Sequence, residues 1–212
     1  MAIYNVSANS LIHLGPAVSG NFSYIALAGG FSLTPCLGSM SYSFKEKIGA
    51  TSRLIAASQL EYQRQQTSTM ALLDSAIPDY QRPLTLDFMP HSQWHELPRL
   101  QQARFCHLGF TLSGSINRMG IALKGPHIPA PSPGIRSEGN GPGTIQLPPH
   151  GKPIVLMREH QTIGGYAKLG TLTQAAISQL SQAGAHTQIN FHPVDRATAQ
   201  ALGVLHHHSF ST

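Results

Sequence analysis

Charged residues are scarce in this sequence. Only 11% of its 212 residues are Asp, Glu, Lys or Arg, against about a quarter in an average soluble domain. The 14 basic and 9 acidic residues give a formal net charge of +5. The basic residues are scattered, and no stripe of them alternates with aromatic residues as in a nucleic-acid-binding surface. The composition therefore argues against a nucleic-acid partner and leaves a few basic groups that could attract a small carboxylate or phosphate.

Cysteines and long apolar runs are also few. The chain has two cysteines, Cys36 and Cys106, far apart in the sequence, and we interpret them as buried thiols in a reducing compartment. No apolar run approaches the length of about 20 residues that a membrane helix needs. The first residues also lack the basic and apolar segments of a secretory leader. These features predict a soluble, cytoplasmic protein with no membrane partner.

Glycine and proline, in contrast, are plentiful, at 20 and 15 residues. This composition favours a mostly-β globular protein with many tight turns and two or three short helices. Helices are expected at 69–80, where Pro78 limits the segment, at 91–97 and at 175–183, where Gly184 supplies the stop. Alternation and bounding turns predict strands at 11–14, 22–28, 84–88, 105–112, 120–123, 144–147, 154–157 and 188–191.

Twelve histidines raise the question of a metal site. His91 and His95 are four residues apart and would share one face of a helix. No Glu follows His91 directly and no third ligand can be identified, so a surface or capping role is favoured. The three histidines at 206–208 form no closed site. We therefore expect no metal.

A polar segment surrounds the pair Gly164 and Gly165. Paired glycines can form a backbone nest whose N–H groups receive an oxyanion, although more often they only make a turn. The hydrogen-bonding side chains crowded around this pair give the nest hypothesis more weight: Gln161, Thr162, Tyr166 and Lys168. Two further polar clusters lie nearby in sequence, at 137–139 and at 118–120. Taken singly, each cluster is at least as well explained by a structural role, so their concentration within 118–168 is the more useful observation.

Together these clusters resemble one family. Residues 137–156 read SEGNGPGTIQLPPHGKPIVL and 161–168 read QTIGGYAK, and RMG at 118–120, YIALAGG at 24–30 and LGS at 37–39 also match. The pattern resembles that of the C subunit of 5-oxoprolinase. This family is also described as biotin-dependent carboxyltransferases or allophanate hydrolase subunit 2, and it is related to urea amidolyase. The long ordered motif within 137–168 is the most specific part of the resemblance.

The resemblance implies cyclophilin-like β-barrels, two in the complete subunit. It places the remainder of a first, incomplete barrel at 1–68, a second barrel at 69–198 and a flexible tail at 199–212. It also implies ATP-dependent opening of 5-oxoproline to glutamate, in a complex with B-type and A-type subunits. Carboxyltransferase relatives pass a carboxyl group between carboxybiotin and a urea-like amide. The chain has no biotin-attachment or ATP-binding motif, so partner subunits would carry ATP or biotin.

The same resemblance suggests roles for the polar residues. Proton transfer and catalysis are assigned to Glu138, Gln161, Tyr166 and Lys168. A second group is assigned to binding of the small amide substrate: Arg118, Gln146, Thr162, Gly164 and Gly165. In this scheme Lys168 or Arg118 neutralises a substrate carboxylate, and the glycine N–H groups stabilise developing charge on oxygen.

The sequence also departs from the family pattern. Ile163, Ala167 and Glu159 stand where Thr, Pro and Asp are usual, and about a third of the expected subunit, at its N-terminal side, has no counterpart. A barrel without those strands has open edges that another chain would have to cover. Two hypotheses follow: an enzyme subunit, or a non-catalytic protein that binds a B-type subunit. A cyclophilin-like prolyl isomerase rests on fold analogy alone.

Overall fold

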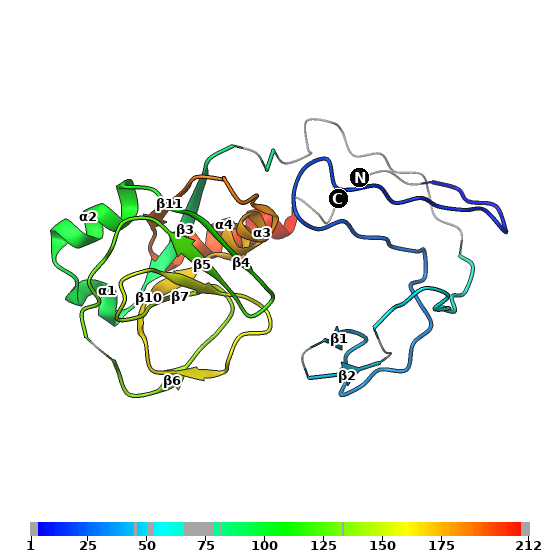
Figure 1. The fold of residues 1–212 in the computed structure, drawn as a ribbon, viewed down its shortest axis with the longest axis horizontal. Coiled ribbons are helices and arrows are strands. Elements are labelled where there is room, and N and C mark those ends of the chain that lie inside the picture. The colour runs from blue at the N-terminus through cyan, green and yellow to red at the C-terminus, as the bar shows by residue number, and fades with distance from the viewer. Residues whose placement is uncertain are drawn as a thin grey trace. The chain divides into compact units, whose positions relative to one another are not determined.

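The computed structural model describes residues 4–44, 46–50, 53–65, 79–80, 82–132 and 134–208, apart from the side chains of residues 115 and 208. The chain divides into two compact units (Figure 1). The N-terminal unit comprises Met1–Pro16 and Ser23–Pro78, and the C-terminal unit comprises Ala17–Phe22 and Asp79–Thr212. The helix expected at 69–80 lies almost entirely outside the described residues.

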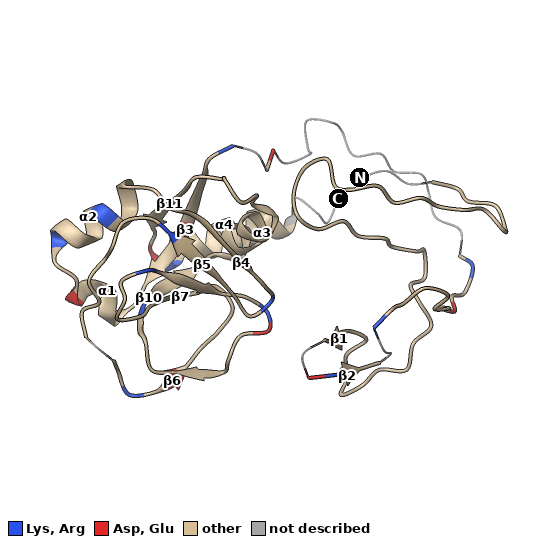
Figure 2. Ribbon diagram, viewed as in Figure 1, with Lys and Arg blue, Asp and Glu red and all other residues tan. Residues whose placement is uncertain are grey.

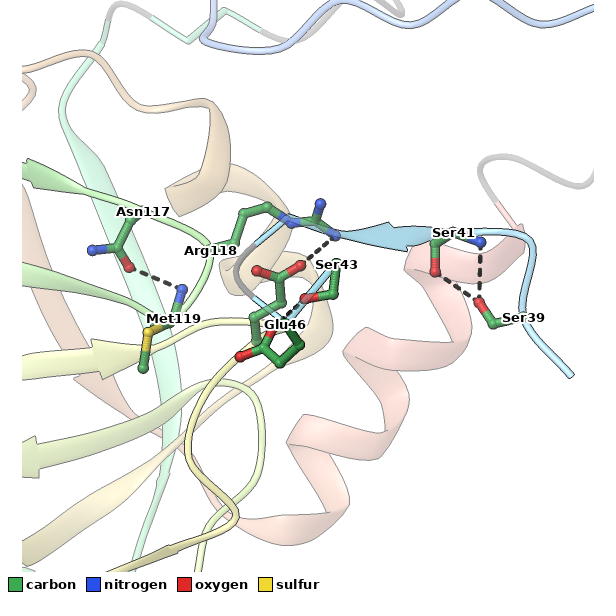
Figure 3. Close-up of polar contacts among 8 residues, drawn as sticks. Ser39, Ser41, Ser43, Glu46, Asn117, Arg118 and Met119 are labelled. Carbon is green, nitrogen blue, oxygen red and sulfur yellow. Dashed lines mark hydrogen bonds and ion pairs between the residues drawn. The ribbon is translucent and has the colours of Figure 1, made fainter. Parts of the chain in front are cut away.

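The described part of the N-terminal unit has little regular structure. Its two strands, β1 (Tyr42–Ser43) and β2 (Ile48–Gly49), form one short antiparallel pair. Ser39 and Ser41 are joined through their hydroxyl groups at 2.7 Å, and Ser43 donates to Glu46 (Figure 3). The strands predicted at 11–14 and 22–28 were wrong, because these segments find no partner strand among the described residues. Leu11 and Tyr24 are correspondingly 95% and 83% exposed.

A seven-stranded sheet forms the body of the C-terminal unit, in the order β11-β3-β10-β7-β8-β5-β4. Neighbouring strands are antiparallel, except that β11 runs parallel to β3. The strands are β3 (Leu84–Pro90), β4 (Thr111–Ile116), β5 (Gly120–Lys124), β7 (Thr144–Leu147), β8 (Ile154–Leu156), β10 (Ala167–Leu172) and β11 (Ile189–Pro193).

The sheet curls until its two edges meet. Phe110, directly before β4, forms an antiparallel bridge with Ile189 of β11, with two N–H to carbonyl bonds of 2.7 Å. The mostly-β prediction is therefore confirmed. A separate two-stranded element, the β6–β9 ribbon, pairs β6 (Glu138–Gly139) with β9 (Ile163–Gly164). This ribbon carries parts of both halves of the sequence motif.

Four helices are present in the described part of the chain, rather than two or three: α1 (Ser92–Glu96), α2 (Arg99–His107), α3 (Gln174–Gln182) and α4 (Arg196–His208). The first half of the strand expected at 105–112 belongs to α2, which precedes Gly109 in a left-handed conformation (φ +70°). Helix α4 replaces most of the flexible tail expected from residue 199. It packs against α3 and β3, and Asp195 accepts a bond from the Thr198 N–H at its start (2.7 Å).

An aromatic cluster fills the curled sheet. Phe105 stacks on Phe191 with ring centroids 4.4 Å apart, and Phe88 meets Trp94 edge to face at 5.2 Å. Contacts of this kind add to the apolar burial that stabilises the unit. The charged residues of the C-terminal unit lie scattered over strands, turns and helices rather than in one basic band (Figure 2). None of the helices built from described residues combines the length and the apolar character needed to cross a bilayer.

Candidate functional site

An ion pair between a buried lysine and an exposed glutamate joins the two halves of the sequence motif. Lys168 Nζ lies 2.7 Å from Glu138 Oε2 and donates to the Gly139 carbonyl at 3.1 Å. The Lys168 side chain is 10% exposed and that of Glu138 is 45% exposed. A buried ammonium group requires such partners, since its desolvation is otherwise unfavourable. Strand β10 and the β6–β9 ribbon therefore bring together two residues that the sequence assigned to catalysis.

A chain of three side-chain amides lies beside this pair. Gln161 Nε2 donates to Gln146 Oε1 at 3.3 Å, and Gln146 Nε2 donates to Asn140 Oδ1 at 3.4 Å. We call these three residues the amide chain. Gln146 is fully buried on β7, directly opposite Lys168 on β10. The sheet register thus links the amide chain to the ion pair.

Gly164 allows the amides to approach the backbone closely. A Cβ atom at this position would lie 2.7 Å from Asn140 Nδ2 and 2.8 Å from Gln146 Nε2. Neither Gly164 nor Gly165 has the positive φ that a backbone nest requires, so the nest geometry expected here is absent. The requirement for glycine at 164 comes instead from the space the two amides occupy.

His91 is a further member of the site. Its Nε2 lies 3.1 Å from the Thr171 hydroxyl, and its backbone N–H donates to Leu169 at 2.9 Å. Burial lowers the pKa of His91 below its ordinary 6.5, and the charge of Lys168 lowers it further, against an opposing effect of Glu138. The imidazole is therefore neutral at pH 7.

The sequence prediction for His91 was partly right. It occupies the N-cap position of α1, but its side chain makes no capping bond. Sequence reasoning also missed Asn140, although this residue lies inside the quoted motif. The signal that both residues share is their position, since each polar side chain directly follows a strand.

Arg118 lies in a different cluster. Its guanidinium forms an ion pair with Glu159, drawn as a dashed line at Arg118 in Figure 3. The two groups are 3.1 Å apart, and the Arg118 side chain is 55% exposed. Asn117 Oδ1 accepts bonds from the N–H groups of Met119 and Gly120 and so shapes this turn between β4 and β5. The contacts of Arg118 do not connect it with Lys168 or the amide chain.

Tyr166 and Thr162 lie on the surface. Tyr166 is 44% exposed. Thr162 is also exposed, and its backbone carbonyl accepts a hydrogen bond from the Asn140 N–H at 2.8 Å.

The fold brings together five of the residues predicted from the sequence: Glu138, Gln146, Gln161, Lys168 and Gly164. It adds Asn140 and His91 to them. The roles assigned from the sequence to all nine predicted residues, those gathered here included, stay predictions.

A pocket of about 410 Å³ lies outside this site, between α2 and β11, and its lining includes Trp94, Arg99, Cys106 and Phe191. Burial raises the pKa of the Cys106 thiol to about 11, so the thiol is protonated and a poor nucleophile at neutral pH. Cys106 and Cys36 are free and only partly buried, not buried as expected. Among the described residues, no three His, Cys, Asp or Glu side chains gather in a way that would hold a metal ion.

Comparison with known proteins relates this geometry to a family. Residues 1–193 match the carboxyltransferase domain, subdomains A and B. The chain is 30% identical over 204 residues to the C subunit of 5-oxoprolinase from Haemophilus influenzae, covering 94% of this chain and 64% of that protein. It is 31% identical over 166 residues to the C subunit of 5-oxoprolinase from Escherichia coli, covering 77% and 53%.

The chain thus spans less than two thirds of the length of these two relatives. Its fold also resembles the crystal structure of Kluyveromyces lactis urea amidolyase, with a TM-score of 0.77 at 17% identity. That match covers 92% of this chain and 13% of the urea amidolyase. At this identity the likeness concerns the fold.

Proposed function

Because this chain belongs to the family of carboxyltransferase domains with subdomains A and B, we propose that it acts as part of the C subunit of an ATP-dependent 5-oxoprolinase-type complex. The complex would hydrolyse the cyclic amide of 5-oxoproline: water adds to the carbonyl carbon, the ring C–N bond breaks and its nitrogen takes up a proton, which gives glutamate. Two relatives that are named as C subunits of 5-oxoprolinase support this proposal. In it, B-type and A-type subunits are the partners, and ATP is used by a partner subunit rather than by this chain.

Opening of a lactam makes three demands on a site. The carbonyl has to be polarised, a proton has to reach the leaving nitrogen, and the carboxylate of 5-oxoproline needs a counter-charge. The observation that carries the proposal is the convergence of three suitable elements in this fold. These are the Lys168–Glu138 pair, the amide chain and the neutral imidazole of His91.

Each element has a role in the proposed reaction. Lys168, held 2.7 Å from Glu138, would bind the substrate carboxylate, and Glu138 or His91 would hold the proton in transit. The neutral state of His91 suits a proton acceptor at pH 7. Gln146 and Gln161 would orient the planar amide through their donor and acceptor groups. Tyr166 and Thr162, which are exposed, would contact the substrate or a partner at the entrance.

A second candidate function is transfer of a carboxyl group between carboxybiotin and a urea-like amide. The family description and the fold shared with urea amidolyase favour it. Carboxybiotin would be carried by a partner and would supply the activated carboxyl group. The same residues serve either substrate, since urea and 5-oxoproline both present a planar amide with a carbonyl oxygen.

Reconstitution tests the proposal. The chain is mixed with matching A-type and B-type subunits, and glutamate formation from 5-oxoproline is measured with and without ATP. Replacement Lys168→Met should lower kcat/KM by about 100-fold or more, because the buried counter-charge is lost. Lys152→Met is the matched control, since Lys152 is exposed on the turn between β7 and β8, and it should retain activity.

The full-length protein of a relative serves as the positive control. If that control is active and this chain is inactive but still co-purifies with the B-type subunit, the chain is a binding protein and the enzymatic proposal fails. Carboxylation of urea in a carboxybiotin-dependent assay, without cleavage of 5-oxoproline, would establish the second candidate instead.

A further inference from the structure

One polar atom in the candidate site is buried without a partner. Asn140 Nδ2 is shielded from solvent and makes no hydrogen bond within the described structure. Two other polar groups of Asn140 are engaged, since Oδ1 accepts from Gln146 at 3.4 Å and the backbone N–H donates to Thr162 at 2.8 Å. A buried donor without an acceptor is unfavourable unless something else supplies the acceptor.

The donor-to-acceptor direction of the amide chain determines which ligand atom can bind at Asn140. Gln161 donates through its nitrogen to the Gln146 oxygen, and Gln146 donates through its nitrogen to the Asn140 oxygen. The chain therefore ends on the NH₂ group of Asn140, which is a donor only. A ligand atom that meets this end has to be an acceptor, such as a carbonyl or carboxylate oxygen, and cannot be an N–H group.

We propose that Asn140 is a specificity-determining residue that binds the carbonyl oxygen of the small amide ligand. This inference rests on the proposed function for the identity of the ligand. A site that presents a buried donor rejects a ligand that places another donor there, because both groups would then lose their hydrogen bonds. Asn140 thus selects the orientation in which the amide oxygen points into the site.

The ligand reaches Asn140 when β9 separates from β6. Gly164 covers the Asn140 amide closely, since a Cβ on Gly164 would lie 2.7 Å from Nδ2. The ribbon that holds Gly164 in place pairs only two residues on each strand. Its neighbour Ile163 is 63% exposed, so little apolar burial opposes the separation.

Nuclear magnetic resonance of the full chain tests the contact directly. The side-chain amide signal of Asn140 is assigned in a ¹⁵N,¹³C-labelled sample, and 5-oxoproline and urea are titrated in separate experiments. The Asn140 side-chain protons should move downfield as they gain an acceptor. A matching assay in the reconstituted complex uses Asn140→Asp, which keeps the shape and removes the donor.

Asn140→Asp should lower kcat/KM for 5-oxoproline by about 10²- to 10³-fold. Gln174→Glu makes the same chemical change at the exposed start of α3 and should leave it unchanged. If the signals of Gln161 and Lys168 move while that of Asn140 does not, the inference is overturned and the proposed function stands. If the wild-type complex does not cleave 5-oxoproline but urea still shifts the Asn140 signal, the proposed function fails and the inference stands.

Discussion

Lys168 and His91 show how two basic side chains share a small site. The ammonium group of Lys168 pairs with Glu138 and donates to the Gly139 carbonyl. The charge on Lys168, together with burial, then disfavours a second charge on His91. The site therefore places an ammonium group, which suits binding of an anion, near an imidazole whose neutral form is favoured, which suits transfer of a proton.

The lowered pKa of His91 predicts a pH dependence of stability. The unfolded chain binds the His91 proton more tightly than the folded chain, so the free energy of unfolding should fall as the pH drops below the ordinary value of 6.5. His91→Gln should remove this part of the pH dependence. Urea unfolding at pH 7.5 and 5.5 measures it, with His95→Gln, at an exposed position on α1, as the control. An equal pH dependence in wild type and His91→Gln would contradict the prediction.

Gly164 is expected to be intolerant of any side chain. Gly164→Ala would place a methyl group within 2.8 Å of two amide nitrogens and push Asn140 away from Gln146. We expect the free energy of unfolding to fall by about 1–3 kcal/mol, measured by chemical denaturation. Gly139→Ala in the same ribbon meets nothing within 4 Å and should change the stability by less than about 0.5 kcal/mol. Equal effects of the two substitutions would show that close packing at Gly164 is unimportant.

At the scale of elements, local sequence patterns predicted some helices and strands correctly, whereas a boundary that depends on tertiary contacts was missed. The strands expected at 120–123 and 144–147 and the helix expected at 175–183 correspond to β5, β7 and α3. In each case the signal, a repeat of apolar residues or a turn at the end, lies within the segment or directly beside it. The segment 105–112 was only half right because Phe105 and Phe110 are both buried apolar residues, so hydrophobicity alone did not separate α2 from β4.

Helix α3 offers a test of whether a local signal, the residue that caps the helix, stabilises the protein. The Thr173 side chain accepts a bond from the Ala176 N–H at 3.3 Å and caps the helix. Thr173→Ala should lower the free energy of unfolding by about 1 kcal/mol. Gln179→Ala, at an exposed position in the middle of the same helix, should be neutral or slightly stabilising because Ala favours the helix. A destabilisation by Gln179→Ala as large as that by Thr173→Ala would argue against the cap.

At the scale of the whole molecule, the buried apolar core belongs to one unit. Among the described residues, the core side chains run from Leu84 to Val194. The bridge between Phe110 and Ile189 that joins the edges of the sheet also lies within this range. The segment Ala17–Phe22, much earlier in the chain, belongs to the same unit, and Asn21 donates from it to the carbonyls of Ser181 and Ala183.

A fragment of residues 79–212 should therefore fold alone. We expect cooperative thermal unfolding, with a Tm several degrees below that of the full chain because the bonds of Asn21 are lost. Circular dichroism and calorimetry of the two proteins measure this difference. A matched fragment beginning at residue 17 retains those bonds and should recover the lost stability. A fragment 79–212 without a cooperative transition would show that the two units depend on each other for folding.

The sequence by itself determined the family, the mostly-β class and most of the strands of the C-terminal unit. These features were predictable because motifs, turns and repeats of apolar residues are formed by residues close together in the sequence. Only the tertiary structure decided that Lys168 meets Glu138, that Asn140 ends a chain of amides and that His91 is neutral. It also decided that segments 11–14 and 22–28 are not strands, because a strand exists only where another strand satisfies its backbone hydrogen bonds. Such contacts join residues distant in sequence, and no local pattern encodes their geometry.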